Sequence, residues 1–460
     1  MCEALSVAPA TVSSSKRKSS MSSPRLRILL NIVWLVIERL ARIAAGLAVG
    51  IVVARYLGPT NYGKISYIQA IVAVAATVAG MGLEPVLMME LIAGKQPRIT
   101  AYSSALGIAA LTSVAATVVG LIYSFSFVGD RELRTLFIIA FSCLPLQTAT
   151  IIAVPLQAEE KFALLVRYQL VQIAISVALR FLLVWLKADL AWFMLATGAD
   201  ALVWVSILLR LKYGHETKFH ARHIKRVVAT TLAAAGAPLF VTNLVVQLQV
   251  RIDQMLLGIL APASAVGNFS VASRLAEALM MGPSVVIRAL NPQLLRAQAI
   301  SSDEFHAVLR RQFDISVAIA ILIACVFCAA SKLLVSVLFG GQYHTAAASL
   351  AILSWVVVPM TIGSVNANAI IAQRQTKQTL VKATIGLGVN ALLNFMFIPI
   401  WGSTGSAAAT LSSHICSAYF GMLIFQRQRF QFVYASRALF FPATLYRYRS
   451  HILSLLRRAR

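Results

Sequence analysis

Residues 28–54 read ILLNIVWLVIERLARIAAGLAVGIVVA, an apolar run with three charged residues near its middle. A transmembrane helix needs about 20 predominantly apolar residues, so this run is long enough to cross a bilayer. Its charges, Glu38, Arg39 and Arg42, would be costly if they faced lipid. The run therefore predicts a membrane span that turns a polar face towards an internal cavity.

Eleven further runs of this kind follow in the chain. They are residues 65–92, 99–127, 133–157, 163–186, 190–211, 227–259, 264–290, 312–338, 346–372, 380–400 and 404–426. Such long, continuous runs predict helices, because the strands of a membrane β-barrel would be about 10 residues long and alternating. The chain is 59% hydrophobic and only 12% charged, whereas soluble domains are about 25% charged. We therefore predict an all-α integral membrane protein with about twelve transmembrane helices, arranged as two six-helix lobes around a central cavity.

The polar segments predict the boundaries of these lobes. We expect a disordered basic cytoplasmic tail (1–27), an N-terminal lobe (28–211), a cytoplasmic inter-lobe loop (212–226), a C-terminal lobe (227–426) and a basic C-terminal tail (427–460). The last segment is rich in aromatic and basic residues, which favours an interfacial position on anionic lipid.

The two lobes carry related sequence motifs. Leu57-Gly58-Pro59, followed by Gly63 and Ser66, is similar to Leu260-Ala261-Pro262, followed by Gly267 and Ser270. Because six helices separate the motifs, both lobes would keep the same orientation, related by an axis along the membrane normal.

The basic residues predict the topology. The chain has 41 Lys and Arg against 16 Asp and Glu, and its net charge is +25. Lys and Arg gather in alternate loops, whereas the loops around Ala263, Gly341 and Gly402 contain none. Since basic loops stay in the cytoplasm, both termini are predicted to be cytoplasmic. This spread through short loops does not favour nucleic-acid binding, which needs basic residues gathered on one wetted face.

Ionisable residues inside the spans are the candidate site. We expect five arginines to bind an anionic substrate: Arg39, Arg42, Arg180, Arg251 and Arg274. We expect three carboxylates to serve ion coupling: Glu38, Asp253 and Glu277. Guanidinium suits phosphate because it binds bidentately and stays protonated. The alternative is that these residues form buried ion pairs that only hold helices together.

Motifs for other chemistry are missing from the sequence. It contains no G-x-x-x-x-G-K-[ST] phosphate loop, no H-E-x-x-H zinc motif and no G-x-S-x-G nucleophile elbow. We therefore expect no cofactor, no metal and no enzymatic activity.

Several motifs together resemble a known family. They are Asn31-Ile-Val-Trp34 with Glu38-Arg39-x-x-Arg42, then Ala54-Arg55-Tyr56-Leu57-Gly58-Pro59-x-x-Tyr62-Gly63, Gly80-x-Gly82-Leu83, Arg251 to Gly258, and Val266 to Glu277. This combination, spread over residues 28 to 426, is similar to the bacterial polysaccharide-transporter flippases of the multidrug/oligosaccharidyl-lipid/polysaccharide superfamily. Ala261 stands where that family often carries glycine in the second repeat.

The resemblance implies a function and a location. It implies a flippase of the bacterial inner membrane that moves undecaprenyl-pyrophosphate-linked oligosaccharide from the cytoplasmic to the periplasmic leaflet. The implied mechanism is alternating access coupled to an ion, and the implied partners are membrane lipid, a polysaccharide polymerase and a chain-length regulator.

Three other functions compete with this one. A multidrug exporter of the same superfamily would prefer an acidic or aromatic cavity for cationic drugs. A membrane oligosaccharide polymerase or glycosyltransferase would usually carry a large external loop, and the external loops here are short. A scaffold protein would not need so many intramembrane charges.

Overall fold

The computed structural model describes residues 24–210, 221–373 and 377–440, and within them every element is a helix. The all-α fold predicted from the apolar runs is confirmed. The expected N-terminal tail, inter-lobe loop and C-terminal tail lie wholly or mostly outside the described residues, and the predicted domain limits stay predictions.

The first group of helices follows the predicted N-terminal lobe. It comprises α1 (Pro24–Gly80), α2 (Leu83–Ala93), α3 (Arg98–Phe127), α4 (Arg131–Ser142), α5 (Leu144–Thr148), η1 (Ala149–Ala153), α6 (Val154–Ala158), α7 (Phe162–Trp185) and α8 (Leu190–Arg210).

The second group begins after the short turn η3 (Ala221–His223). It comprises α9 (Arg226–Leu260), α10 (Ala263–Leu279), α11 (Met281–Ile300), α12 (Ser302–Phe339), η4 (Gly341–Tyr343), α13 (Ala346–Ala372), α14 (Lys377–His414), η5 (Ile415–Phe420), α15 (Gly421–Ile424), η6 (Gln426–Gln428) and α16 (Arg429–Leu439).

Kinks at glycine and proline divide the longest helices. Gly58 interrupts α1 with a φ of 73°, and Pro59, which has no backbone N–H to donate, follows it. Gly402 interrupts α14 in the same way, with a φ of 55°. The predicted eighth span is broken between α10 and α11, just before Pro283, whose ring prevents a regular turn.

Nine segments of the described chain are long and apolar enough to cross a membrane. Two of them, Val36–Ala93 and Gln378–Ile424, are much longer than one bilayer thickness and contain the kinks at Gly58 and Gly402. Each of these two covers a pair of predicted spans, and neither half of the broken eighth span is among the nine. The multi-pass membrane architecture is confirmed, whereas the number twelve stays a prediction.

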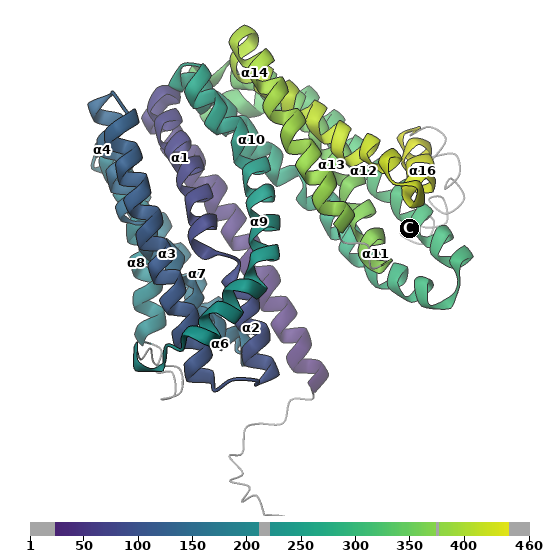
Figure 1. The fold of residues 1–460 in the computed structure, drawn as a ribbon. Coiled ribbons are helices and arrows are strands. Elements are labelled where there is room, and N and C mark those ends of the chain that lie inside the picture. The colour runs from purple at the N-terminus through teal and green to yellow at the C-terminus, as the bar shows by residue number, and fades with distance from the viewer. Residues whose placement is uncertain (1–23, 211–220, 374–376, 441–460) are drawn as a thin grey trace, which may run out of the picture.

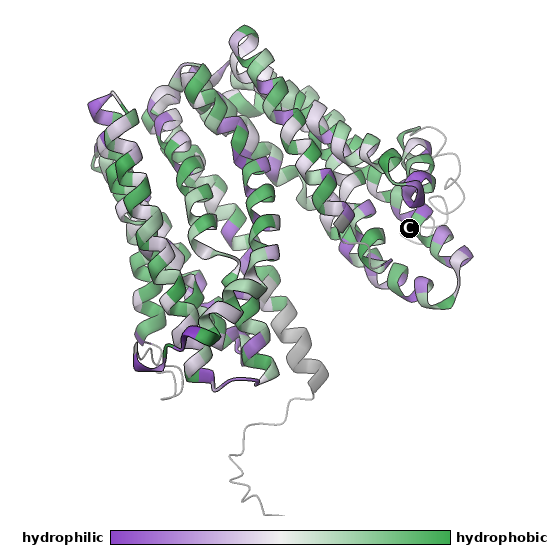
Figure 2. Cartoon of the chain, viewed as in Figure 1, coloured by the Kyte–Doolittle hydropathy of each residue, from purple (hydrophilic) through white to green (hydrophobic). Residues whose placement is uncertain are grey.

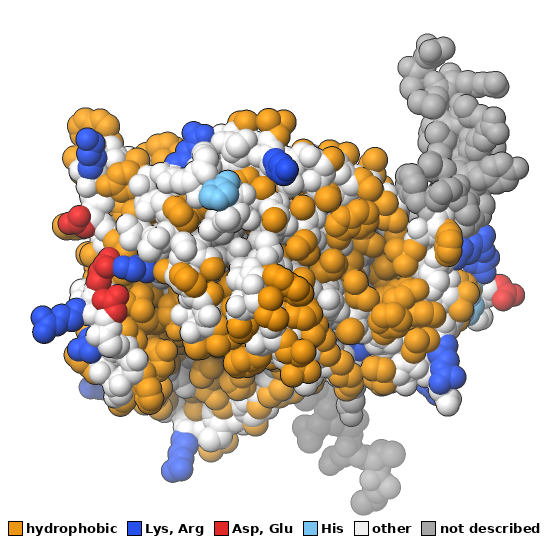
Figure 3. All heavy atoms as spheres, turned by 90° about the horizontal axis from the view of Figure 1, so that it is seen from above, with side chains coloured by type: hydrophobic (Ala, Val, Ile, Leu, Met, Phe, Trp, Pro, Cys, Tyr) orange, Lys and Arg blue, Asp and Glu red, His pale blue; other side chains and the backbone are white. Residues whose placement is uncertain are grey.

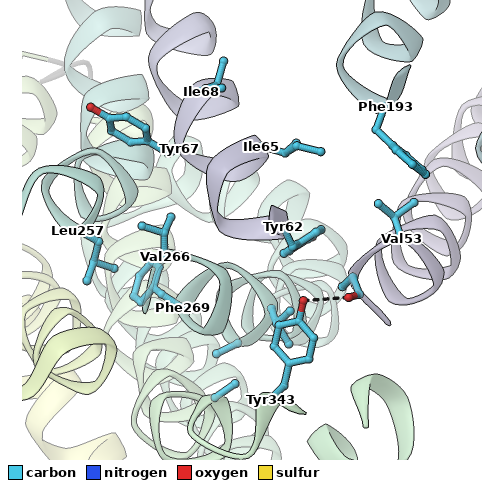
Figure 4. Packing of buried hydrophobic residues seen from close by; sticks show 14 of the residues in the cluster. Val53, Tyr62, Ile65, Tyr67, Ile68, Phe193, Leu257, Val266, Phe269 and Tyr343 are labelled. Atoms are coloured by element: carbon cyan, nitrogen blue, oxygen red, sulfur yellow. Dashed lines mark hydrogen bonds between the residues drawn. The ribbon is translucent and has the colours of Figure 1, made fainter. Parts of the chain in front are cut away.

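The two groups of helices meet at one end and diverge towards the other (Figure 1). A hydrophobic core shared by both groups fills the upper end, with Tyr62 and Ile65 of α1 beside Val266 and Phe269 of α10 (Figure 4). There the Tyr343 hydroxyl donates to the Ala54 carbonyl at 2.9 Å. A separate core of the second group alone includes residues from Leu279 to Ala438.

The repeated motifs pack on each other at this shared end. A Cβ on Gly63 would lie 1.8 Å from the Ala263 carbonyl oxygen, and a Cβ on Gly267 would lie 2.0 Å from the Pro59 carbonyl oxygen. Corresponding glycines of α1 and α10 therefore allow both backbones to approach, as small residues do between membrane helices.

At the lower end, α9 contacts the first group of helices. Its first turns, with Val228 and Leu232, belong to a core formed with α2 and α3. Gly82, with a φ of 64°, lies against Gly236 of α9, where a Cβ would approach the Gly236 carbonyl oxygen to 2.9 Å. Pro238 follows within α9, and the helix changes direction along its length (Figure 1).

The outer surface suits a bilayer. Large apolar side chains such as Leu111, Val119 and Trp185 are exposed on the helices, and hydrophilic residues gather at the helix ends (Figure 2). Seen from the closed end, the molecule is mostly apolar or uncharged, with most charged side chains towards its edges (Figure 3).

Candidate functional site

A cavity of about 800 Å³ lies between the two groups of helices. We call it the central cavity. Residues of α1, α7 and α8 line one side, and residues of α10 and α11 line the other. Its charged lining consists of five arginines and two carboxylates: Arg39, Arg42, Arg180, Arg274, Arg288, Asp200 and Glu277. The cavity is therefore cationic, although lipid-facing helices surround it.

Two of these arginines have a carboxylate partner. Arg180 holds Asp200 bidentately, through Nη1–Oδ1 at 3.0 Å and Nη2–Oδ2 at 2.5 Å. The Arg42 Nη2 atom lies 2.5 Å from Glu38 Oε1, one turn earlier on α1. These pairs reduce the net charge of the cavity and fix the side chains that form them.

Arg274 is held differently. Its guanidinium lies 5.9 Å from the centre of the Tyr62 ring, a cation–π distance. Arg274 also passes close to α1 at Gly50. A Cβ added to Gly50 would lie 2.3 Å from Arg274 Nη1. No ion pair joins it to Glu277 within the described residues, although the two are three positions apart on α10. Arg274 lines the central cavity without a carboxylate partner among the described residues.

The structure brings together five of the eight predicted site residues and leaves three outside. Arg39, Arg42, Arg180, Arg274 and Glu277 line the central cavity. Glu38 is not in the lining but contacts it through Arg42. Arg251 and Asp253 lie elsewhere on α9. The Nη1 atom of Arg251 is 3.4 Å from Gln254 Oε1, and its buried Nε has no partner among the described residues.

Two lining residues were not among the predicted site residues. Arg288 lies near the end of the predicted span 264–290, and α11 continues past it to Ile300 and places it in the lining of the cavity. Met281 and Arg288 give a signal, because positions seven apart on one helix share a face, and both line the cavity. Asp200 lies inside the predicted span 190–211, and its pairing with Arg180 explains how this charge is accommodated there.

Asp253 lies in a polar cluster within the second group of helices. Its Oδ1 accepts hydrogen bonds from Asn390 at 3.1 Å and Asn394 at 2.8 Å, and lies 3.5 Å from the Ser406 hydroxyl. We call these four residues the Asp253 cluster. All of its members are buried, and no basic side chain contacts the carboxylate within the described chain. The carboxylate itself can bind a proton or a small cation, whereas no described group of three His, Cys, Asp or Glu side chains could bind a metal.

A second cavity, of about 430 Å³, lies between α9 and the lower part of the first group. Its polar lining is uncharged except for Glu84, and consists otherwise of Thr77, Gln147, Thr148, Thr150, Asn243 and Gln247. It therefore differs in chemistry from the arginine-rich central cavity.

Comparison with known proteins identifies the family. A sequence model described as "Polysaccharide biosynthesis protein" matches residues 28–298. The chain belongs to this polysaccharide biosynthesis protein family. The resemblance seen in the motifs of α1, α9 and α10 is thus confirmed. Among curated proteins, a sequence comparison finds no match.

Solved structures show that this family member has a transporter fold. A "Lipid II flippase MurJ, inward closed conformation" has a TM-score of 0.69 at 16% identity, covering 92% of this chain and 100% of that one. An inward-facing multidrug resistance MATE transporter of the MOP superfamily has a TM-score of 0.70 at 14% identity, covering 88% and 99%. An outward-facing MATE transporter has a TM-score of 0.58 at 14% identity, covering 90% and 96%.

Proposed function

We propose that this protein is a flippase for undecaprenyl-pyrophosphate-linked oligosaccharide in surface polysaccharide biosynthesis. The cationic central cavity between the two groups of helices carries the proposal. A pyrophosphate head group is a multivalent anion, and arginine binds phosphate oxygens with paired donors. The lipid tail would remain in the bilayer while the head group crosses the cavity. A polymerase and a chain-length regulator would act on the product.

Alternating access is supported by the packing of the two ends. The cavity is closed where α1 and α10 meet at Gly63 and Gly267, and the second group has its own core at the other end. The two inward structures have TM-scores of 0.69 and 0.70, whereas the outward-facing MATE transporter has 0.58. This difference agrees with an inward-facing state of the present protein. With cytoplasmic termini in the inner membrane, the substrate would enter from the cytoplasmic leaflet and leave to the periplasmic one.

Ion coupling would use the Asp253 cluster, which lies outside the central cavity. Loading or unloading its carboxylate would change the packing of α9 against α14, and α9 contacts both groups of helices. The cluster could therefore link ion binding to the movement of one group against the other.

Arg274 gives the cleanest test of substrate binding, because no described carboxylate pairs with it. We expect Arg274→Ala to lower the flipping rate about ten- to hundredfold, since a charged hydrogen bond contributes about 1.5–3 kcal/mol. Arg274→Lys should restore only part of the rate, because an ammonium lacks the planar fork of donors. The measurement is the fraction of lipid-linked oligosaccharide that becomes accessible to an external glycosidase in reconstituted vesicles.

Arg296→Ala is the matched control, since Arg296 is exposed on α11 and does not line the cavity. It should flip at the wild-type rate. Normal flipping by Arg274→Ala at equal abundance would refute the binding role. If the wild-type protein flipped no lipid-linked oligosaccharide but exported a cationic dye, the multidrug-exporter function would replace the proposal.

A further inference from the structure

The second cavity offers neutral hydrogen-bonding groups from both groups of helices. Gln147 comes from α5, and Asn243 and Gln247 come from α9. Asn243 and Gln247 are four positions apart and so lie on the same face of the helix. Each carboxamide supplies two N–H donors and an acceptor oxygen. Three carboxamides therefore converge on one space.

These carboxamides have no side-chain partner within the described part of the chain. The neighbouring threonines Thr77 and Thr148 do bond, to carbonyls of their own helices. Polar groups at membrane depth are costly unless they are hydrogen-bonded. The unpaired amides are consistent with a cavity that receives a hydrogen-bonding ligand.

The second cavity lies on the same face of α1 as the central cavity. Gln69 lines the central cavity and Ala76 lines the second one. Seven residues are nearly two helical turns, so these positions face the same direction about 10 Å apart along the helix. A ligand anchored at the arginines could therefore extend a further group of that length into the second cavity.

We propose that the second cavity is a subsite for the sugars of the lipid-linked substrate, separate from the cationic site for its pyrophosphate. The inference rests on the proposed flippase function. Neutral sugars present neighbouring hydroxyl groups, each a donor and an acceptor, which carboxamides and hydroxyls can bind in pairs. They need no cationic partner, and Glu84 can accept further hydroxyl donors.

The test compares two probes on the purified protein in nanodiscs. One is undecaprenyl pyrophosphate without sugars, and the other is the same carrier bearing the oligosaccharide purified from the protein's own host. The variant combines Gln147→Ala, Asn243→Ala and Gln247→Ala. We expect the wild-type protein to bind the sugar-bearing carrier about tenfold or more tightly than the bare carrier. The triple variant should lose this preference and keep the wild-type affinity for the bare carrier.

Gln298→Ala is the matched control, because Gln298 is an exposed amide of α11 outside both cavities. It should keep the preference. A triple variant that still prefers the sugar-bearing carrier, or a wild-type protein with no preference, overturns the sugar subsite and leaves the flippase function standing. A wild-type protein that binds neither carrier overturns the flippase proposal itself. Unchanged binding of the bare carrier shows that the triple variant is folded.

Discussion

Burial of a carboxylate without a cationic partner is costly inside a membrane protein, and a bound proton or cation would lower that cost. Asp253 is in this position, with Asn390 and Asn394 as donors. We predict that Asp253→Asn keeps its abundance, since the amide is isosteric, but loses the response to an ion gradient. In vesicles with an imposed proton or sodium gradient, the Asp253→Asn protein should flip lipid-linked oligosaccharide only as fast as it does without a gradient.

The control for this prediction is Asp303→Asn, which alters an exposed carboxylate in the first turn of α12. It should respond to the gradient like the wild-type protein. An Asp253→Asn protein that keeps its gradient response at equal abundance would show that the cluster is structural.

At this scale the sequence predicts which residues are unusual but not how they pair. Asp253 is recognisable as a charge in an apolar run, whereas its partners Asn390 and Asn394 lie 137 and 141 positions away. The pairing of α9 with α14 depends on tertiary packing, which helical periodicity does not encode. Arg180 and Asp200 are closer in sequence, and their pairing likewise follows from how α7 packs on α8.

Among the elements, the contact between α1 and α10 closes one end of the central cavity. Gly63→Ala should weaken this contact, because the new Cβ would overlap the Ala263 carbonyl oxygen and overpacking costs about 1–3 kcal/mol. We predict that the equilibrium shifts towards the outward-open state by about five- to hundredfold. A cysteine introduced by Val266→Cys, in a chain without its native cysteines, should react faster with an impermeant thiol reagent added outside.

Gly46→Ala is a suitable control, since a Cβ on Gly46 of α1 meets nothing within 4 Å. It should leave the labelling rate unchanged. Equal labelling of the Gly63→Ala and wild-type backgrounds would argue against the α1–α10 contact as the gate.

The elements themselves follow from the apolar runs, and their interruptions follow from glycine and proline. The motif Gly58-Pro59 predicts a break, and the helix does kink there, with helix continuing directly on both sides. The end of the predicted eighth span was less accurate. That span was predicted to end at residue 290, two residues after Arg288, but α11 extends to Ile300, and Arg288 faces the cavity rather than lipid.

For the whole molecule, the number of crossings decides where the termini lie. If each of the nine apolar segments crossed the membrane once, the odd number would place the two termini on opposite sides. If the two kinked segments cross twice and the α10–α11 pair also crosses, the total is twelve and both termini share one side. The distribution of Lys and Arg favours the second arrangement, because the loops around Ala263, Gly341 and Gly402 contain no basic residue.

Reporter fusions distinguish these two arrangements. A fluorescent protein that matures only in the cytoplasm should be bright when fused at Gly214, which lies outside the described residues, and after Arg460. Alkaline phosphatase, which is active only outside the cytoplasm, should be active at Gly341, between α12 and α13. Suppose that alkaline phosphatase is active when fused after Arg460, while the fluorescent protein is bright at Gly214. The second group would then cross the membrane an odd number of times. The six-helix lobe would then be wrong, and with it the pseudo-symmetry that sets Gly63 against Gly267.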